Sequence, residues 1–295
     1  MHAPVTEEEA SGTGTPGWQL RHARVALATP LLMGILNVTP DSFSDGGRHL
    51  EVEAAVKRAL EMIEQGAGMI DIGGESTRPG AAPVPVAEEI ARVVPVVREL
   101  KAATSVPISV DTRRTEVARE AIAAGADVIN DVSGLGDAEM AGVVAAGQAG
   151  LVLMHMRGTP QTMQRNPSYG DVTTEVRDEL GGALAAALAA GVEPDRIVID
   201  PGIGFAKNLD HNLQLLAQLP LLRELGRPLL LGVSRKAFIG SLLGGVEPYQ
   251  RDVGTAAACV VGLLAGVRIF RVHDVRTVRE AITVAEAIRV AGTAA

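Results

Sequence analysis

The chain has 295 residues, of which 47% are hydrophobic, 2% aromatic and 21% charged, with a formal net charge of −8. This negative charge offers no electrostatic footprint for a phosphate backbone, so we expect no nucleic-acid partner. The longest apolar run near the end, residues 256–267, falls short of the roughly 20 residues of a membrane-spanning helix, and we expect no membrane association.

The first 17 residues carry three consecutive glutamates and then a Gly/Thr/Pro mixture. They lack the basic start and apolar middle of a signal peptide, which predicts a disordered tail. Residues 18–295 are expected to form one domain. The single Cys259 lies in a small apolar run, which predicts an inert core thiol and a cytoplasmic protein.

Eight short apolar runs, each followed by an amphipathic segment rich in Ala, Leu and Glu, recur from residue 31 onward. They cover residues 31–36, 69–72, 107–110, 128–129, 151–154, 197–199, 229–233 and 269–270. Eight strand–helix units predict the α/β class and a single (β/α)8 TIM barrel. Residues 25–28 could add a hairpin that closes the barrel's bottom. A doubly wound open sheet normally has fewer strands and a Gly-rich fingerprint, which is missing after the first run.

Polar side chains follow every one of these runs. They are Asn37, Asp71, Asp111, Asn130, His155, Asp200, Ser234 with Lys236, and Arg271 with His273. Active sites of such barrels form at the carboxyl ends of the strands, so we expect these groups to share one site. Taken singly, Asp111 could cap the next helix and His155 could be a satisfied core histidine.

Two loops have functional composition. Residues 37–47 form a long polar connection with one Phe and a Gly pair, which is typical of a lid. Residues 73–80 combine hydroxyls, a guanidinium and three glycines, which favours an anionic ligand.

The acidic and basic groups predict two subsites. Asp111, Asn130 and Asp200 suit a flat heterocycle with several N–H donors, although the same oxygens could bind a divalent metal, and spacing alone does not separate the two. The basic residues after the last two runs occupy the usual phosphate region of a barrel. Arg271 and His273, two positions apart on a strand, point the same way.

Several motifs together resemble the dihydropteroate synthase family over about residues 30–290. They are Asn37–Gly47, Asp71–Gly80, Ser109–Thr112, Asp200–Lys207 and Ser234–Lys236, with His155–Pro160 and Arg271–Val275 also similar. The resemblance implies an enzyme that condenses a dihydropterin-methyl diphosphate with 4-aminobenzoate and releases diphosphate. It also implies Mg²⁺ as cofactor and a homodimer.

The resemblance further implies roles for individual residues. The catalytic set is Asp71, Lys236, Arg271 and His273. The pterin diphosphate contacts are Thr77, Asp111, Asn130, Asp200, Lys236, Arg271, Val272 and His273. The 4-aminobenzoate contacts are Thr39, Phe43, Ser76, Thr77, Arg78, Phe205 and Lys207, and the metal ligand is Asn37. One departure is Ala237, which stands where many relatives have Ser, so a backbone N–H would have to replace that hydroxyl.

Two other functions share part of this pattern. A pterin-dependent methyltransferase also grips a pterin with Asp and Asn, but it has little use for Arg271, His273 and the long first loop. A non-catalytic pterin-binding paralogue should have lost loop or lysine residues, whereas every major motif here is intact.

Overall fold

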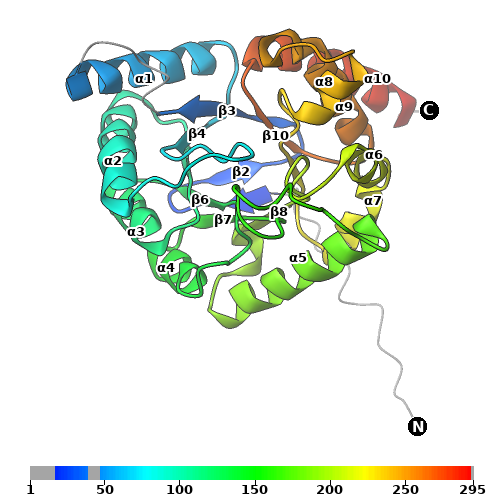
Figure 1. Ribbon diagram of the computed structural model, residues 1–295. Helices are drawn as coiled ribbons and strands as arrows, with labels where there is room; N and C mark the ends of the chain where they lie inside the picture. Colours follow the sequence, from blue (N-terminus) through cyan, green and yellow to red (C-terminus); the bar gives the residue numbers. More distant parts are fainter. Residues whose placement is uncertain (1–16, 39–46, 294–295) are drawn as a thin grey trace.

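The computed structural model describes residues 17–38 and 47–293 (Figure 1). Of the predicted tail, residues 1–16 lie outside this range. Gly17, the last residue of the predicted tail, is the first residue of strand β1 (Gly17–Gln19). Thr39 and Phe43, which are predicted contacts of 4-aminobenzoate, also lie outside the described residues.

Eight parallel strands form the predicted barrel. They are β3 (Leu31–Asn37), β4 (Met69–Gly73), β5 (Ile108–Asp111), β6 (Val128–Asp131), β7 (Gly150–Met154), β8 (Ile197–Asp200), β9 (Leu230–Leu231) and β10 (Ile269–Val272). Their order is β8-β7-β6-β5-β4-β3-β10-β9, and a parallel bridge between Ile199 and Leu229 closes the circle. All eight predicted runs are therefore strands, and β9 is shorter than its run.

The helices form a ring around these strands (Figure 1). They are α1 (Gly47–Glu64), α2 (Val86–Ala103), α3 (Thr115–Ala124), α4 (Met140–Gly147), α5 (Val172–Ala189), α6 (Leu209–Ala217), α7 (Leu219–Leu222), α8 (Ala237–Leu242), α9 (Asp252–Leu264) and α10 (Val275–Thr293). Within residues 17–38 and 47–293, none of the helices combines the length and hydropathy that a membrane span needs.

The predicted hairpin closes the amino-terminal end of the barrel. Strand β1 pairs antiparallel with β2 (Arg24–Ala26), and the fully buried Trp18 donates a 2.8 Å hydrogen bond from Nε1 to the carbonyl of Arg196. Trp18, Leu20 and Leu27 form an apolar cluster with inward-facing strand residues such as Val128. Apolar side chains therefore fill this end of the barrel, and the polar strand ends lie at the other end.

Alternation along each strand separates the core from the site. In β4, Met69 belongs to the barrel interior, whereas Ile70 and Ile72 join the large apolar cluster with the helices. Asp71 and Gly73 consequently face inward, because successive strand residues point to opposite faces. Polar residues late in each strand therefore converge at the barrel mouth.

Candidate active site

Four polar side chains from four strands are joined at the mouth. Arg271 of β10 donates from Nε to Oδ2 of Asp71 at 2.6 Å and from Nη2 to Oδ2 of Asp111 at 2.7 Å. Asn130 of β6 donates to the same oxygen of Asp71 at 3.1 Å. The other oxygen, Oδ1 of Asp71, is buried and has no hydrogen-bond partner among the described residues. The structure thus brings these predicted site residues together.

Burial controls the charges of this group. Burial raises the pKa of Asp111, while the neighbouring Arg271 lowers it. Burial alone would lower the pKa of Arg271, but Asp71 and Asp111 together raise it. A guanidinium that is always charged therefore compensates two buried carboxylates.

Asp200 ends β8 with one carboxylate oxygen already used. Its Oδ1 accepts a 2.7 Å hydrogen bond from the backbone N–H of Gly202. Burial raises the pKa of Asp200 to about 6, and the Gly202 N–H and the charge of Lys236 act against this shift. Since the carboxylate is 5% exposed, a ligand with N–H donors is the partner that suits the second oxygen.

The glycines after Asp200 allow a close approach that no other residue permits. Gly202 has φ +67°, and a Cβ there would lie 1.8 Å from the carbonyl oxygen of His155. Gly204 has φ +82°, and its Cβ would lie 2.9 Å from Cδ of Lys236. Gly202 therefore requires glycine because a side chain would meet backbone, and a side chain at Gly204 would be strained, which explains the spacing of the Pro-Gly-Ile-Gly motif.

Lys236 and Phe205 lie in contact near the carboxylates, since Asp200 and Asp111 both act on the charge of Lys236. Lys236 precedes α8, and its Nζ lies 3.8 Å from the centroid of the Phe205 ring. Burial lowers the pKa of Lys236 to about 8. Phe205 also packs with Met154 and Met163 in a small apolar cluster. Carboxylates facing an apolar wall with one ammonium suit a flat, donor-rich ring.

His273 stands beside Arg271 at the end of β10. Its Nδ1 lies 2.9 Å from Oγ of Ser234, which also accepts the backbone N–H of His273 at 3.1 Å. Burial, followed by the charge of Arg271, lowers the pKa of His273 to about 3, and Arg78 contributes to this shift. The imidazole is therefore neutral near pH 7, and if the Ser234 hydroxyl donates to Nδ1, the ring proton lies on Nε2.

Lys207 has a different environment from the one that its predicted contact with 4-aminobenzoate requires. Its buried Nζ lies 3.0 Å from the carbonyls of Gly202 and Phe205 and 2.9 Å from Nδ1 of His155. An ammonium has three hydrogens, so all of them are used inside the protein. His155 in turn bonds Glu179 through Nε2 at 3.0 Å. Lys207 therefore supports the turn that carries Phe205.

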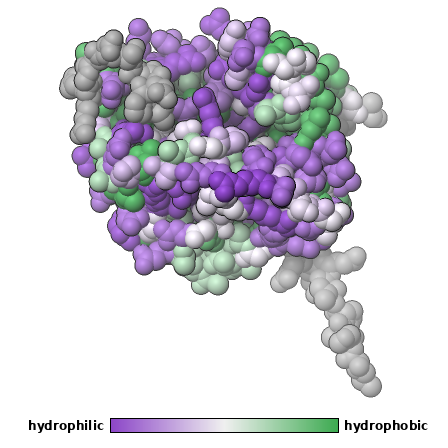
Figure 2. Space-filling view, viewed as in Figure 1, coloured by the Kyte–Doolittle hydropathy of each residue, from purple (hydrophilic) through white to green (hydrophobic). Residues whose placement is uncertain are grey.

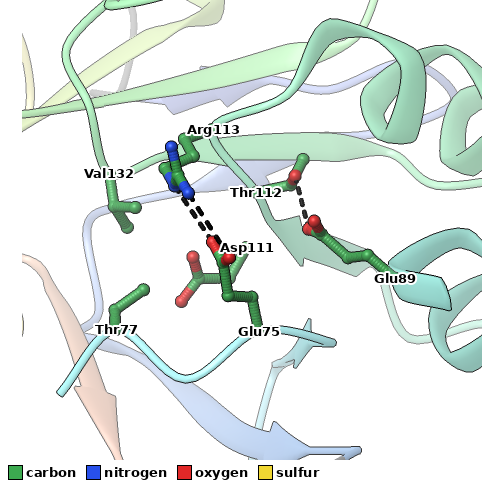
Figure 3. A pocket seen from close by; sticks show the side chains of 7 residues that line it. All are labelled: Glu75, Thr77, Glu89, Asp111, Thr112, Arg113 and Val132. Atoms are coloured by element: carbon green, nitrogen blue, oxygen red, sulfur yellow. Dashed lines mark hydrogen bonds and ion pairs between the residues drawn. The ribbon is translucent and has the colours of Figure 1, made fainter. Parts of the chain in front are cut away.

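The loop after β4 lies against the start of the segment after β5. Thr77 lines a small cavity together with Asp111, Thr112 and Val132 (Figure 3). Ser76 and Thr77 are half-buried, and Arg78 is exposed. A neighbouring cavity of about 230 Å³ includes Ser76 in its lining. Of the 4-aminobenzoate contacts predicted in this loop, Thr77 therefore lies beside Asp111, and Ser76 lines the neighbouring cavity.

Three other residues are placed less simply. Val272 points outward into the core between strands and helices, so only its backbone remains for a ligand. Arg235 forms a two-pronged ion pair with Asp252 at 2.8 Å and faces α9. Asn37 ends β3. Its Oδ1 and the Oδ2 of Asp111 both lie within 4 Å of the point that a Cβ atom on Gly73 would occupy.

Sequence reasoning missed the support of the second loop. Glu75, Arg113 and Arg114 are linked by ion pairs beside the site. Adjacent arginines directly after Asp111-Thr112, together with a glutamate in a Gly-rich loop, were the only available signal. Cys259 is fully buried and burial raises its pKa to about 12, which confirms the predicted core thiol.

Known proteins resemble this chain in sequence and in fold. The model of the pterin-binding enzyme family matches residues 33–273. The dihydropteroate synthase of Synechocystis is 48% identical over 258 residues, covering 87% of this chain and 89% of the relative. A solved structure of Xanthomonas albilineans dihydropteroate synthase with 4-aminobenzoic acid superimposes with a TM-score of 0.88 and 48% identity, covering 94% of this chain and 99% of that chain. The same enzyme with 7,8-dihydropteroate gives 0.85 and 46%, covering 93% and 99%.

The barrel and the converging polar groups at its mouth define a pterin-binding barrel enzyme. Family match, identity and coverage agree on the particular member of that class. The chain belongs to the dihydropteroate synthase family. The members of this family are transferases of folate biosynthesis. This membership confirms the first of the three functions weighed from the sequence.

Proposed function

We infer that this chain condenses (7,8-dihydropterin-6-yl)methyl diphosphate with 4-aminobenzoate to give 7,8-dihydropteroate and diphosphate. The observation that carries this inference is the proximity of two subsites. A wall of buried Asp111, Asn130 and Asp200 adjoins Arg271, and His273 follows on the same strand end. A donor-rich ring and a diphosphate attached to it can therefore be bound together.

The pterin ring is held by Asp111, Asn130, Asp200 and Lys236. The free oxygen of Asp200 accepts from the amino-pyrimidine edge, and Lys236 donates to the carbonyl and ring-nitrogen side. The apolar cluster around Phe205 and Met154 contacts the face of the ring. Each polar group of the heterocycle then meets a complementary group, which compensates the burial of Asp200.

Arg271 and His273 stabilise the leaving group. As the C–O bond between the pterin methylene and the diphosphate breaks, negative charge grows on the diphosphate oxygen, and both side chains bind that charge. Arg271 gives up its bond to Asp111 for this purpose, and Asp71 keeps the guanidinium in place. The electron-rich pterin spreads the positive charge of the methylene carbon, to which the arylamine nitrogen then forms its bond. No protein nucleophile is required.

The acceptor pocket is formed by Ser76, Thr77, Arg78 and Phe205, together with Thr39 and Phe43 of the first loop. Arg78 supplies the positive charge for the carboxylate of 4-aminobenzoate. Lys207 contributes through the position of Phe205, because its ammonium is fully bonded inside the protein. Ala237, which is exposed at the start of α8, offers a backbone N–H in place of a hydroxyl.

The residues present fit a magnesium ion at Asn37. Its carboxamide oxygen and Oδ2 of Asp111 face the same space above Gly73, and Oδ1 of Asp71 is a buried acceptor without a described partner. The described segments contain no cluster of three or more His, Cys, Asp or Glu suited to a metal, whereas Mg²⁺ commonly uses one or two protein oxygens and substrate phosphates. Bound there, the ion would neutralise part of the diphosphate charge.

A homodimer and a cytoplasmic location complete the proposal. Hydrophobic residues gather over α8, α9 and α10 (Figure 2). Among them Val253 is 78% exposed, Leu264 63% and Ile288 69%. An apolar face of this kind suits a second copy of the chain. The parent should sediment as a dimer and an Ile288→Glu variant as a monomer, and a monomeric parent would contradict this part.

Product analysis tests the reaction itself. Purified protein, the pterin diphosphate, 4-aminobenzoate and Mg²⁺ should together yield 7,8-dihydropteroate, identified by its mass. Formation of only the pterin alcohol would show that water is the acceptor and would contradict the proposed acceptor pocket. Methyl transfer to a corrinoid would identify the methyltransferase alternative.

A further inference from the structure

The loop between β4 and α2 is closed at its neck by one carboxylate. Oε1 of Glu75 accepts a 2.9 Å hydrogen bond from the backbone N–H of Val84. Residues 76–83 therefore leave and rejoin the barrel at one point, as in a compact surface loop with close ends. Thr77 and Arg78 lie within this span, so the neck sets where they stand.

Two arginines from the next strand end hold the same carboxylate. Arg113 donates to Glu75 from Nε at 3.0 Å and from Nη2 at 3.3 Å, and Arg114 donates from Nη2 at 2.9 Å. Figure 3 shows Glu75 and Arg113 joined across the gap between the two segments. Glu75 is 7% exposed, and a charge so buried is tolerated because opposite charges and hydrogen bonds surround it.

The network continues to the residue beside Asp111. Arg114 pairs through Nη1 with Oε2 of Glu89 at 3.1 Å, and the hydroxyl of Thr112 donates to Oε1 of Glu89 at 2.7 Å. Two carboxylates and two guanidiniums give this cluster no net charge when all are ionised. Glu75, Thr77 and Asp111 also line one small cavity. The loop neck therefore lies directly beside the Asp111 side of the pterin wall.

We propose that Glu75 is a positioning residue for the acceptor step, because it fixes the neck of loop 75–84 on Arg113 and Arg114. This inference rests on the proposed function, which places Thr77 and Arg78 at 4-aminobenzoate. Glu75 itself touches no substrate. The ring contacts Asp111, Asn130 and Asp200 stand on the strand ends outside this loop, so we expect loss of Glu75 to affect the second substrate more than the pterin.

A Glu75→Gln variant tests this assignment. The amide keeps the volume and one oxygen for Val84, but its NH₂ group opposes the guanidinium donors. We expect the KM for 4-aminobenzoate to rise about tenfold or more while the calorimetric Kd for the pterin diphosphate changes less than about threefold. Arg113→Met, at a partly exposed position, should shift the same KM. The KM of the double variant should not exceed that of the more affected single variant, because both substitutions remove the same contact between Glu75 and Arg113.

Glu286→Gln is the matched control, because Glu286 on α10 is likewise held by two arginines, Arg268 and Arg289, away from the mouth. It should leave both constants unchanged. An active parent with an unchanged KM in Glu75→Gln, or an equal loss of pterin affinity, overturns the inference alone. If Glu75→Gln does not fold, an unchanged KM in Arg113→Met overturns it. A parent without dihydropteroate production overturns the proposed function and this inference together.

Discussion

Arg271 of β10 donates a 2.7 Å hydrogen bond to Oδ2 of Asp111 of β5. These two strands are not neighbours in the sheet. The guanidinium thus spans the mouth and compensates the carboxylate that the proposed function assigns to the pterin ring. In the proposed function substrate binding exchanges this contact, because diphosphate offers Arg271 a new partner and the ring offers Asp111 new donors.

Arg271→Ala should therefore weaken binding of the diphosphate substrate far more than binding of a pterin that lacks diphosphate. Charge-assisted bonds to phosphate are lost in the first case only. Calorimetry with both ligands measures the difference, and Arg268→Ala, at the other end of β10, is the control. Equal weakening of the two ligands would remove Arg271 from the diphosphate subsite. His273→Ala should show the same selectivity.

Pterin affinity should depend on pH through Asp200. Burial raises the pKa of Asp200 to about 6, so the carboxylate that accepts ring donors is present above that pH and protonated below it. The Kd for pterin should therefore rise as the pH falls from 7.5 to 5, by up to about tenfold per unit once Asp200 is protonated. Asp111, whose pKa burial raises to about 7, should add to this rise near neutral pH. Calorimetry across this range measures it, and a Kd that stays constant down to pH 5 would contradict the role of Asp200.

Asp200→Asn should remove the same interaction at neutral pH. The amide presents a donor where the ring also presents donors, and such a mismatch costs about 1–3 kcal/mol. Calorimetric titration of a pterin into the variant and the parent compares the two. Equal affinity would show that Asp200 lies outside the ring contacts.

Lys207→Met should weaken pterin binding as well as the acceptor step. The ammonium supports the carbonyls of Gly202 and Phe205, and unsatisfied buried acceptors cost about 1–3 kcal/mol in the free energy of unfolding. Denaturant unfolding and pterin calorimetry measure both effects, with the exposed Lys57→Met as control. If only 4-aminobenzoate affinity fell, Lys207 would contact that substrate directly.

Order of binding should follow from the two loops. The pterin wall is built on strand ends, whereas the acceptor pocket also needs the first loop, so 4-aminobenzoate should bind second. Titration of 4-aminobenzoate into free enzyme and into enzyme saturated with pterin, Mg²⁺ and diphosphate compares its Kd in the two states. Marked tightening is expected only in the second titration; comparable affinity would refute the ordered mechanism.

The strands could be predicted because each is a short apolar run with a polar end. The predicted length of β9 is too great, because the apolar run 229–233 includes Gly232 and Val233, which do not belong to the strand. Alternation also explains Val272, since the period that aligns Arg271 with His273 turns the residue between them toward the helices.

The contacts between site residues could not be predicted. Glu75 and Arg113 lie 38 positions apart, and no local pattern relates a glutamate in a glycine-rich loop to an arginine beyond the next strand. Lys207 belongs to a motif that the sequence reveals, but its hydrogen bonds do not follow from the motif. One of its partners is His155, and the turn at Gly202 packs against that residue. Such pairings arise only from the closed barrel.

Diphosphate release, measured with each substrate omitted in turn, tests the central claim most directly. We expect release from the parent chain only when the pterin diphosphate and 4-aminobenzoate are both present, with one diphosphate formed per dihydropteroate. Release at the same rate without 4-aminobenzoate, or no release with both substrates and Mg²⁺, would contradict the account.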